Sequence, residues 1–514
     1  MTSADVRRAC LVPTFALVLY AEWNTGLATD DFGLITKATT GSLSNLWPGM
    51  YVSTPLLKLT HAMPYFTLGE TFWAYTLIKA AYVFWAIYAA HRFFGLFVTP
   101  LRAWLGALLL LLSPLHDGAT LWFAGQYLIL SLGFYLLAYV KAHENRSGAA
   151  VLLALCGSFS NYGSPSIAAG LTLMFLLQRR WRAAVLILVP NAVYSAYYFY
   201  TSTVLKIGTA RLPDEFDLQS FLKSYVAQLA SFLDAGVGPS AWLKYALSLS
   251  SLSWVSATLA LAAAAWLWRL SRRHSMAASD PPPSRLLLAG SGAIALSAFC
   301  LFALTSGYPQ VTFSLGNRIV IFGNLFLVSL VLHSARPAAL TILTAVTVTA
   351  FLGVSSHWSR WNAIVMESFA DIRALDLPMF HPPETLFVRG LQFSRLGPLS
   401  HIDHFTATYV VRDMFALARR GHEPIRAASF NSRLQLESDH LVDIKYGDLM
   451  PVGESILLYD AERNTMTVVA RGDITNQLAA LPRDLRHWTQ LIGPGMFRDT
   501  ILVLMPRLKY AYRD

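Results

Sequence analysis

The chain has 514 residues, of which 55% are hydrophobic and only 14% are charged, and its formal net charge is +10 at pH 7. Because soluble domains carry about 25% charged residues, this composition excludes an ordinary soluble enzyme, a disordered chain and a typical nucleic-acid-binding protein. It indicates a membrane protein.

Apolar segments long enough, or nearly long enough, to cross a bilayer recur from residue 9 to residue 355. We expect an α-helical polytopic domain of residues 1–357 with about eleven transmembrane helices. They are placed at 9–24, 71–90, 103–115, 121–140, 148–162, 165–177, 183–203, 242–268, 286–305, 318–333 and 338–355. The segments at 148–177 are also consistent with one long tilted helix.

The basic residues orient these segments. The residues from Trp358 onward carry no net charge, so the whole positive excess lies before them. With a cytoplasmic N-terminus, the inner loops hold fourteen Lys and Arg residues and the outer loops hold five, as the positive-inside rule requires. We therefore expect a multi-pass protein of the bacterial plasma (inner) membrane, with large outer loops at 24–70 and 204–241 and an extracytoplasmic C-terminal region.

The non-membrane segments contain elements of both types. An amphipathic helix is expected around 216–233, in the second large outer loop. Residues 358–514 are expected to form an α/β domain, with helices at 360–375 and 400–419 and with strands at 455–459 and 465–470. The turn Glu462-Arg463-Asn464 joins these two strands into a predicted hairpin.

Two adjacent carboxylates, Asp30 and Asp31, follow the first span within a few residues. Like charges so close raise the pKa of one carboxyl group, and partial burial raises it further. Such a carboxylate is suited to act as a general base on a hydroxyl nucleophile. A solvated loop pair and a helix N-cap before Leu34 are the alternatives. The pattern does not distinguish Asp30 from Asp31 as the base.

His116 and Asp117 lie in a very short second outer loop. Because a tight loop must pack against its neighbours, these side chains can face the same cavity as Asp30 and Asp31. Acidic groups from two loops could share a divalent cation, Mg²⁺ or Mn²⁺, or orient an acceptor. A simple interfacial turn is the alternative.

Two cations lie in or beside the predicted spans. Arg318 begins the tenth span directly after Gly316-Asn317, where a guanidinium group and a helix N-terminus together suit a lipid phosphate. Lys79 lies within the second span, and ionisable groups inside a membrane are costly and often functional. We predict that both bind the phosphate. Snorkelling to headgroups is the alternative for each.

Other motifs are weak or absent. His401 and His404 would lie one helical turn apart if 400–419 is a helix, as a metal site could require. No further ligand set lies nearby in the sequence, so the polar face of an exposed helix is the preferred interpretation. The chain has no P-loop, no G-x-S-x-G and no H-E-x-x-H, which gives nucleotide hydrolysis and the standard hydrolases no support.

Taken together, these features resemble the GT-C glycosyltransferases, membrane enzymes that take a sugar from a polyprenyl-phosphate donor. The resemblance rests on Asp30-Asp31-Phe32 with Trp47 and Tyr51-Val52-Ser53-Thr54-Pro55, on Ser113-Pro114-Leu115-His116-Asp117 with Trp122 and Gly125, and on Trp361 to Pro382-Pro383 with the strand Thr385-Leu386-Phe387-Val388. The turn Asn161-Tyr162-Gly163-Ser164 lacks the acidic residue that many members carry. The Trp-Trp-Asp motif of oligosaccharyltransferases is also absent.

The resemblance implies an inverting transfer at the outer face of the membrane. Asp30 or Asp31 would take the proton of an acceptor hydroxyl, which attacks the anomeric carbon as the lipid phosphate leaves. Asp117 would then be an auxiliary carboxylate and Arg318 a phosphate ligand. The acceptor is a glycan, a lipid or a protein. The sugar and any metal requirement stay open.

Three other classes share parts of this layout. A lipid-linked oligosaccharide polymerase or ligase also has many spans and large outer loops, but relies more on outer Arg and His residues. A polysaccharide or lipid flippase predicts paired broken spans and internal pseudo-symmetry, and only 157–165 looks broken. A non-catalytic envelope scaffold is the third.

Overall fold

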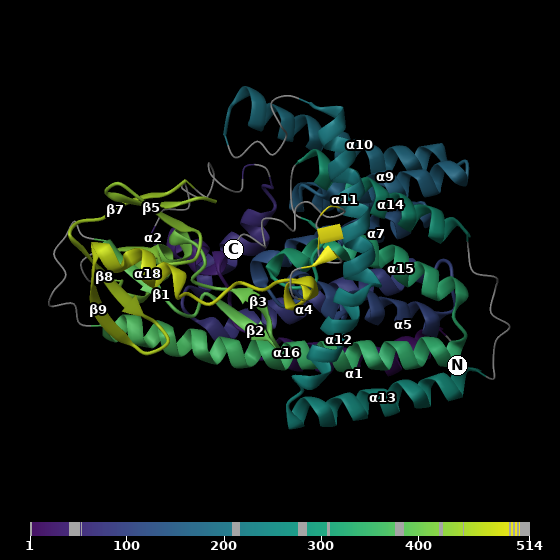
Figure 1. Cartoon of the computed structure of the whole chain (residues 1–514). Helices are drawn as coiled ribbons and strands as arrows, with labels where there is room; N and C mark the ends of the chain where they lie inside the picture. Colours follow the sequence, from purple (N-terminus) through teal and green to yellow (C-terminus); the bar gives the residue numbers. More distant parts are fainter. Residues whose placement is uncertain are drawn as a thin grey trace.

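The computed structural model describes residues 3–40, 52, 54–207, 216–275, 285–305, 309–375, 385–420, 425–445 and 447–492, together with residues 495, 496, 499, 500 and 503. It has a large helical part and a C-terminal mixed α/β part, which lie at opposite ends of the view in Figure 1. The expected combination of a helical domain and an α/β region is therefore confirmed.

The helical part is formed by the first sixteen α-helices. They are α1 (Ser3–Glu22), α2 (Asp30–Thr40), α3 (Met63–Leu68), α4 (Phe72–Phe94), α5 (Pro100–Leu111), α6 (Asp117–Thr120), α7 (Tyr127–His143), α8 (Ser147–Ser160), α9 (Ser164–Leu177), α10 (Trp181–Phe199), α11 (Leu218–Gly236), α12 (Pro239–Ser250), α13 (Trp254–Ser275), α14 (Arg285–Leu304), α15 (Ile321–Ser334) and α16 (Pro337–Ala374). Helix α11 confirms the amphipathic helix expected around 216–233.

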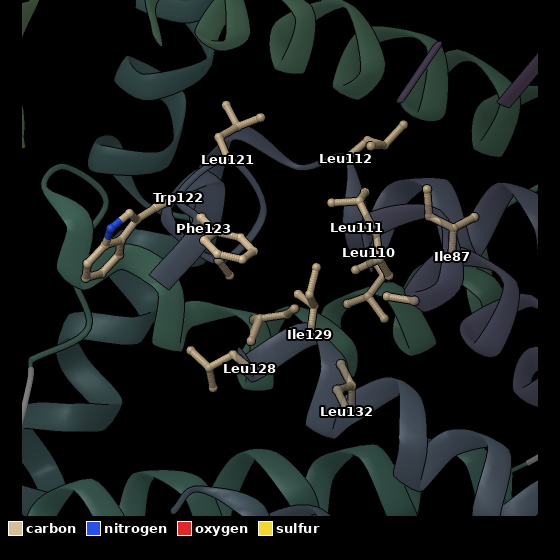
Figure 2. Close-up of a cluster of buried hydrophobic side chains, with 14 of the residues drawn as sticks. Ile87, Leu110, Leu111, Leu112, Leu121, Trp122, Phe123, Leu128, Ile129 and Leu132 are labelled. Carbon is tan, nitrogen blue, oxygen red and sulfur yellow. The ribbon is translucent and has the colours of Figure 1, made fainter. Parts of the chain in front are cut away.

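Short helical turns connect these helices near the site described below. They are η3 (Pro114–His116) and η4 (Phe123–Gly125), on either side of α6, and η6 (Leu315–Val320), which leads directly into α15. Figure 2 shows the apolar core around this region, where Leu121, Trp122 and Phe123 belong to the same cluster as Leu110–Leu112, at the end of α5, and Leu128, Ile129 and Leu132 of α7. The turns are thus seated on a buried apolar base.

The expectation of about eleven transmembrane helices is wrong. In the described part of the chain, five helical segments are long and apolar enough to cross a membrane: Phe123–His143, Trp181–Val204, Arg285–Leu304, Leu315–Ser334 and Pro337–Ala374. The segments Leu218–Ser250 and Trp254–Arg273, bent by 112° at the break between them, make a sixth if they count as one span. The chain is therefore a mostly helical protein with five or six candidate membrane spans.

Helix length explains most of the difference. Four of the predicted spans form apolar helices of only 10–17 residues: Ala9–Glu22, Pro100–Leu111, Ser147–Ser160 and Ser164–Leu177. At 1.5 Å per residue, a helix of 14 residues is about 21 Å long, which is short of the roughly 30 Å hydrocarbon core of a bilayer. The segments at 148–177 are thus two short helices, and the predicted span at 242–268 is interrupted between α12 and α13.

Helix α16 joins the two parts of the molecule. Residues 338–355 and 360–375, expected as a span and a separate helix, form one continuous helix of 38 residues, about 57 Å long. It crosses the predicted domain boundary at residue 357 and runs beneath the α/β part in Figure 1. The helical and α/β parts therefore share one structural element.

The main sheet of the α/β part has four strands in the order β4-β1-β8-β9. Strand β1 (Thr385–Arg389) is parallel to both β4 (Arg426–Ser429) and β8 (Ser455–Asp460). Strand β9 (Thr465–Ala470) is antiparallel to β8. The predicted strand at Thr385–Val388 and the predicted hairpin around Glu462-Arg463-Asn464 are confirmed.

Two smaller sheets complete this part. One is the ribbon of β2 (Phe393–Leu396) and β3 (Leu399–Asp403), and the other contains β5 (Leu434–Glu437), β6 (His440–Asp443) and β7 (Leu449–Pro451). Helix α17 (Thr408–Ala418) packs against β4 of the main sheet, and α18 (Ile474–Ala479) packs against β5.

The predicted helix at 400–419 is therefore wrong in its first part, which is strand β3. The reason is the turn Gly397-Pro398, where Gly397 has a φ of 61°, so the chain folds back and pairs with β2.

A close approach between α12 and α16 generates the first prediction. A Cβ atom at Gly353 would lie 1.9 Å from the backbone oxygen of Ser248, so Gly353→Ala must push the two helices apart. We expect a loss of about 1–3 kcal/mol in unfolding free energy, measured by thermal or denaturant unfolding of the purified protein. The matched control is Gly292→Ala in α14, whose added methyl group would make only ordinary contact with Phe326 at 3.5 Å. Equal stability of the two variants would contradict the prediction.

Candidate functional site

The loop between α1 and α2 is held by a buried lysine. Lys79 of α4 is 1% exposed. Its Nζ donates hydrogen bonds to Thr25 Oγ1 at 2.5 Å and to the Gly26 carbonyl at 3.0 Å, and it lies 3.3 Å from Glu22 Oε2. The structure thus places Lys79 where it fixes the loop that precedes Asp30. In this position its amine has almost no exposed surface with which to contact a lipid headgroup.

Asp31 is a fully buried structural carboxylate. Its Oδ1 accepts hydrogen bonds from the Tyr65 hydroxyl at 2.6 Å and from the Ala124 backbone N–H at 3.0 Å. Its Oδ2 accepts one from the Ala28 backbone N–H at 2.8 Å. Burial raises the pKa of the Asp31 carboxyl group to about 7, although these bonds oppose the shift. The side chain ties the first loop to α3 and η4, and both of its oxygens are engaged.

Asp30, by contrast, is partly exposed and reachable. Its Oδ1 accepts a hydrogen bond of 2.9 Å from the hydroxyl of Tyr409, which belongs to α17 of the α/β part. Burial raises the pKa of the Asp30 carboxyl group, while the bond from Tyr409 and the charge of Arg318 partly offset the shift. The nearby charge of Asp403 raises it further. Of the two adjacent carboxylates, Asp30 is therefore the one suited to take a proton from a substrate.

Arg318 lies at the start of a candidate span, in η6, and its charge acts on Asp30. Its guanidinium group packs over the Trp122 ring, 4.9 Å from the ring centroid, and Nη1 donates to the Leu315 carbonyl at 3.2 Å. Trp122 in turn donates from Nε1 to the Ala28 carbonyl at 3.1 Å. Trp122, which follows the second loop, is thus in contact with both the first loop and Arg318.

Asp117 is the centre of a buried network. Its Oδ1 accepts hydrogen bonds from Lys244 Nζ at 3.1 Å and Asn317 Nδ2 at 2.5 Å. Its Oδ2 accepts from Trp358 Nε1 and His401 Nε2, both at 2.7 Å. Burial alone would raise the pKa of the Asp117 carboxyl group, but the charges of His401 and Lys244 outweigh this effect and hold the pKa well below its usual range. Asp117 is therefore an ionised anchor with no exposed surface.

The three histidines singled out in the sequence are all buried. Burial lowers the pKa of His116 to about 4 and that of His404 to about 3, so both rings are neutral at pH 7. Since residues 399–403 form a strand, His401 and His404 are not one helical turn apart. His401 faces Asp117, whereas the His404 ring packs against aromatic rings such as Phe405, at a centroid distance of 4.1 Å.

These positions also bear on the predicted divalent cation. Asp31 and Asp117 already use both carboxylate oxygens to accept hydrogen bonds from protein groups. Within the part of the chain that the structure describes, no three His, Cys, Asp or Glu side chains are grouped to hold a metal ion. The predicted donor set from the two loops therefore does not fit a shared Mg²⁺ or Mn²⁺.

The sequence analysis did not predict several residues of this site. Lys244, Asn317 and Trp358 surround Asp117, and Tyr409 binds Asp30 from 379 positions away. Only Lys244 carried a local signal, because it is a lone charge in the otherwise uncharged helix Pro239–Ser250. Trp47, Tyr51 and Ser53 of the first-loop motif, and Pro382-Pro383, lie outside the described residues.

The side chains of this site are suited to two tasks, proton acceptance and anion binding. A partly exposed carboxylate with a raised pKa can accept a proton, and a guanidinium group at the start of a candidate span can bind an anion. Comparison with family models, curated proteins and solved structures gives no match. A function must therefore be argued from these side chains.

The network around Asp117 generates the second prediction. Asp117→Asn leaves the buried charge of Lys244 without its counter-ion, so we expect a loss of about 3–5 kcal/mol in unfolding free energy. The double variant Asp117→Asn/Lys244→Met removes both charges and should recover part of this loss. Asp439→Asn, at an exposed carboxylate, is the control and should change little. Thermal unfolding in detergent measures all three, and a double variant no more stable than the single one would count against the charge argument.

Proposed function

We propose that the protein is an integral-membrane glycosyltransferase, which moves a sugar from a polyprenyl-phosphate donor to an acceptor hydroxyl at the outer face of the plasma membrane. The observation that carries the proposal is the partly exposed Asp30 carboxylate, which feels the charge of Arg318 at the start of a candidate span.

Asp30 acts as the general base in this proposal. Its raised pKa makes it a stronger base than an ordinary carboxylate. It takes the proton of the acceptor hydroxyl, whose oxygen attacks the anomeric carbon of the donor. The bond from that carbon to the phosphate oxygen breaks, and the anomeric configuration inverts. Asp31 keeps the loop in place through its three hydrogen bonds and does not touch the substrate.

Arg318 binds the phosphate of the donor. Negative charge on the leaving phosphate oxygen grows as the glycosidic bond breaks, and a fixed guanidinium group stabilises that charge. The Trp122 ring limits the directions that the guanidinium group can take. Because Arg318 lies where Leu315–Ser334 begins, the polyprenyl chain of a bound donor can extend along the membrane beside this helix.

The third prediction tests the base. Asp30→Asn should lower the rate of transfer by about 10²–10⁴-fold while leaving thermal stability close to wild type. The measurement is the glycan composition of the cell envelope, by mass spectrometry, in a deletion strain that carries wild type or variant at matched expression. One sugar should disappear on deletion and return only with wild type.

The controls separate chemistry from folding. Asp31→Asn should lower thermal stability, because its amide nitrogen cannot accept the hydrogen bonds that one carboxylate oxygen now accepts, and Asp439→Asn should restore the glycan fully. Full restoration by Asp30→Asn would refute the base. A lipid-linked oligosaccharide polymerase or ligase, or a flippase, would then become the leading interpretation.

The fourth prediction concerns Tyr409. Tyr409→Phe removes the hydroxyl that stabilises the ionised Asp30 carboxylate, so the pKa of Asp30 should rise further. The base must be ionised, so the acid limb of the pH–rate profile should move to higher pH by the same amount, with the rate on the alkaline plateau nearly unchanged. The assay uses the donor sugar that the glycan analysis identifies. Tyr200→Phe, at an exposed tyrosine, is the control, and an unshifted limb in Tyr409→Phe would contradict the role.

A further inference from the structure

The main sheet of the α/β part contains a point where its strand order reverses. From β1 the chain continues to β4 on one side, and later returns to β8 on the other side of β1. Strands β1 and β8 are parallel, with Arg389 opposite Asp460 at their carboxyl ends. In open sheets with parallel strands, ligands bind outside the carboxyl ends at such a point.

A pocket of about 210 Å³ lies at this point. It is lined by residues 390–393, which follow β1, by Glu462, which follows β8, and by Arg395 and Pro482. Gly390 has a φ of 81°, and Leu391 is a non-glycine residue with a φ of 46°. A Cβ atom at Gly390 would lie 3.0 Å from the Glu462 side chain. The backbone of Leu391 is thus strained, and the absence of a side chain at Gly390 keeps the space beside Glu462 open.

The lining combines three kinds of group. The Arg395 guanidinium lies 5.4 Å from the centroid of the Phe393 ring, so a cation and an aromatic face stand together. Glu462 Oε1 accepts a hydrogen bond from the Leu391 N–H at 3.2 Å, which fixes the carboxylate while leaving it further acceptor capacity. An aromatic face suits the C–H face of a sugar ring, and the charged groups suit its hydroxyls. At about 210 Å³, the pocket is smaller than drug-sized sites and suits a single ring.

The same backbone leads from this pocket to Asp30. Phe393 of β2 is paired with Asp403 of β3, and Asp403 lies close enough to Asp30 for their charges to interact. The His404 N–H donates to the Gln392 carbonyl at 2.8 Å. A short, hydrogen-bonded piece of chain therefore connects the pocket with the general base.

We propose that the pocket at residues 390–393, Arg395 and Glu462 holds one sugar ring of a glycan acceptor, whose next unit then reaches toward Asp30. This inference rests on the proposed function and deepens it, because it selects a glycan as the acceptor rather than a lipid or a protein. It also assigns the α/β part the task of binding that acceptor.

The test measures sugar binding by the full-length protein in a detergent without a sugar headgroup. The probes are glucose, galactose, mannose, arabinose and N-acetylglucosamine, detected by saturation-transfer NMR and titrated for Kd. Arg395→Met and Glu462→Gln change the pocket, and the latter keeps an oxygen for the Leu391 N–H. Arg426→Met and Glu437→Gln are matched controls on exposed strand positions. We expect at least one sugar to bind, with Kd raised about tenfold or more by both pocket variants and unchanged by the controls.

The other outcomes are equally decisive. If no sugar binds, or if all variants bind equally, the proposal is overturned. The Asp30→Asn variant distinguishes the two proposals. If this variant still binds the sugar but no longer transfers it, both proposals are supported. If the wild type transfers the sugar and Arg395→Met has the same acceptor KM as the wild type, the pocket assignment is overturned and the transferase proposal stands. Sugar binding without any transfer by wild type overturns the transferase instead.

Discussion

The ionised carboxylate of Asp117, buried where no water can reach it, constrains the rest of the structure. A buried anion must be matched by donors at short range, and here the donors come from α12, η6, α16 and β3. Each of these elements is therefore held at a fixed distance from the short second loop. The position of η6 also sets that of Arg318, and the position of β3 sets that of Asp403. The geometry around Asp30 thus depends on a charge that itself has no exposed surface.

The acidic residues of the two loops divide their tasks by environment. Asp31 and Asp117 are fully buried, and their carboxylate oxygens accept hydrogen bonds from protein donors, so these side chains hold the loops together. Asp30 keeps exposed surface and receives a hydrogen bond from a residue of another part of the chain. Two neighbouring aspartates with the same chemistry therefore differ in role, because the helix that begins at Asp30 directs one side chain inward and the other toward α17.

Local patterns predicted the local elements well. The alternation in 455–470 gave a real hairpin, and the amphipathic stretch at 216–233 is α11. The number of spans was not predictable from hydropathy, since an apolar helix packed inside the protein has the same composition as one facing lipid. In Phe123–His143, 89% of the most apolar window is buried inside the protein. The contact between Asp30 and Tyr409 was not predictable either, because it depends on chain topology that no local pattern contains.

That long-range contact has a consequence for how the protein is made. Asp30 and Tyr409 are separated by 379 positions, and at roughly 5–20 residues per second the ribosome needs about 20 s or more to pass from one to the other. During that interval the helical part can insert and pack while its acidic group still lacks the partner that sets its final position. Asp30 of a nascent chain thus lacks this hydrogen bond until α17 has been made. A truncated chain that ends within α16 would remain in that unfinished state.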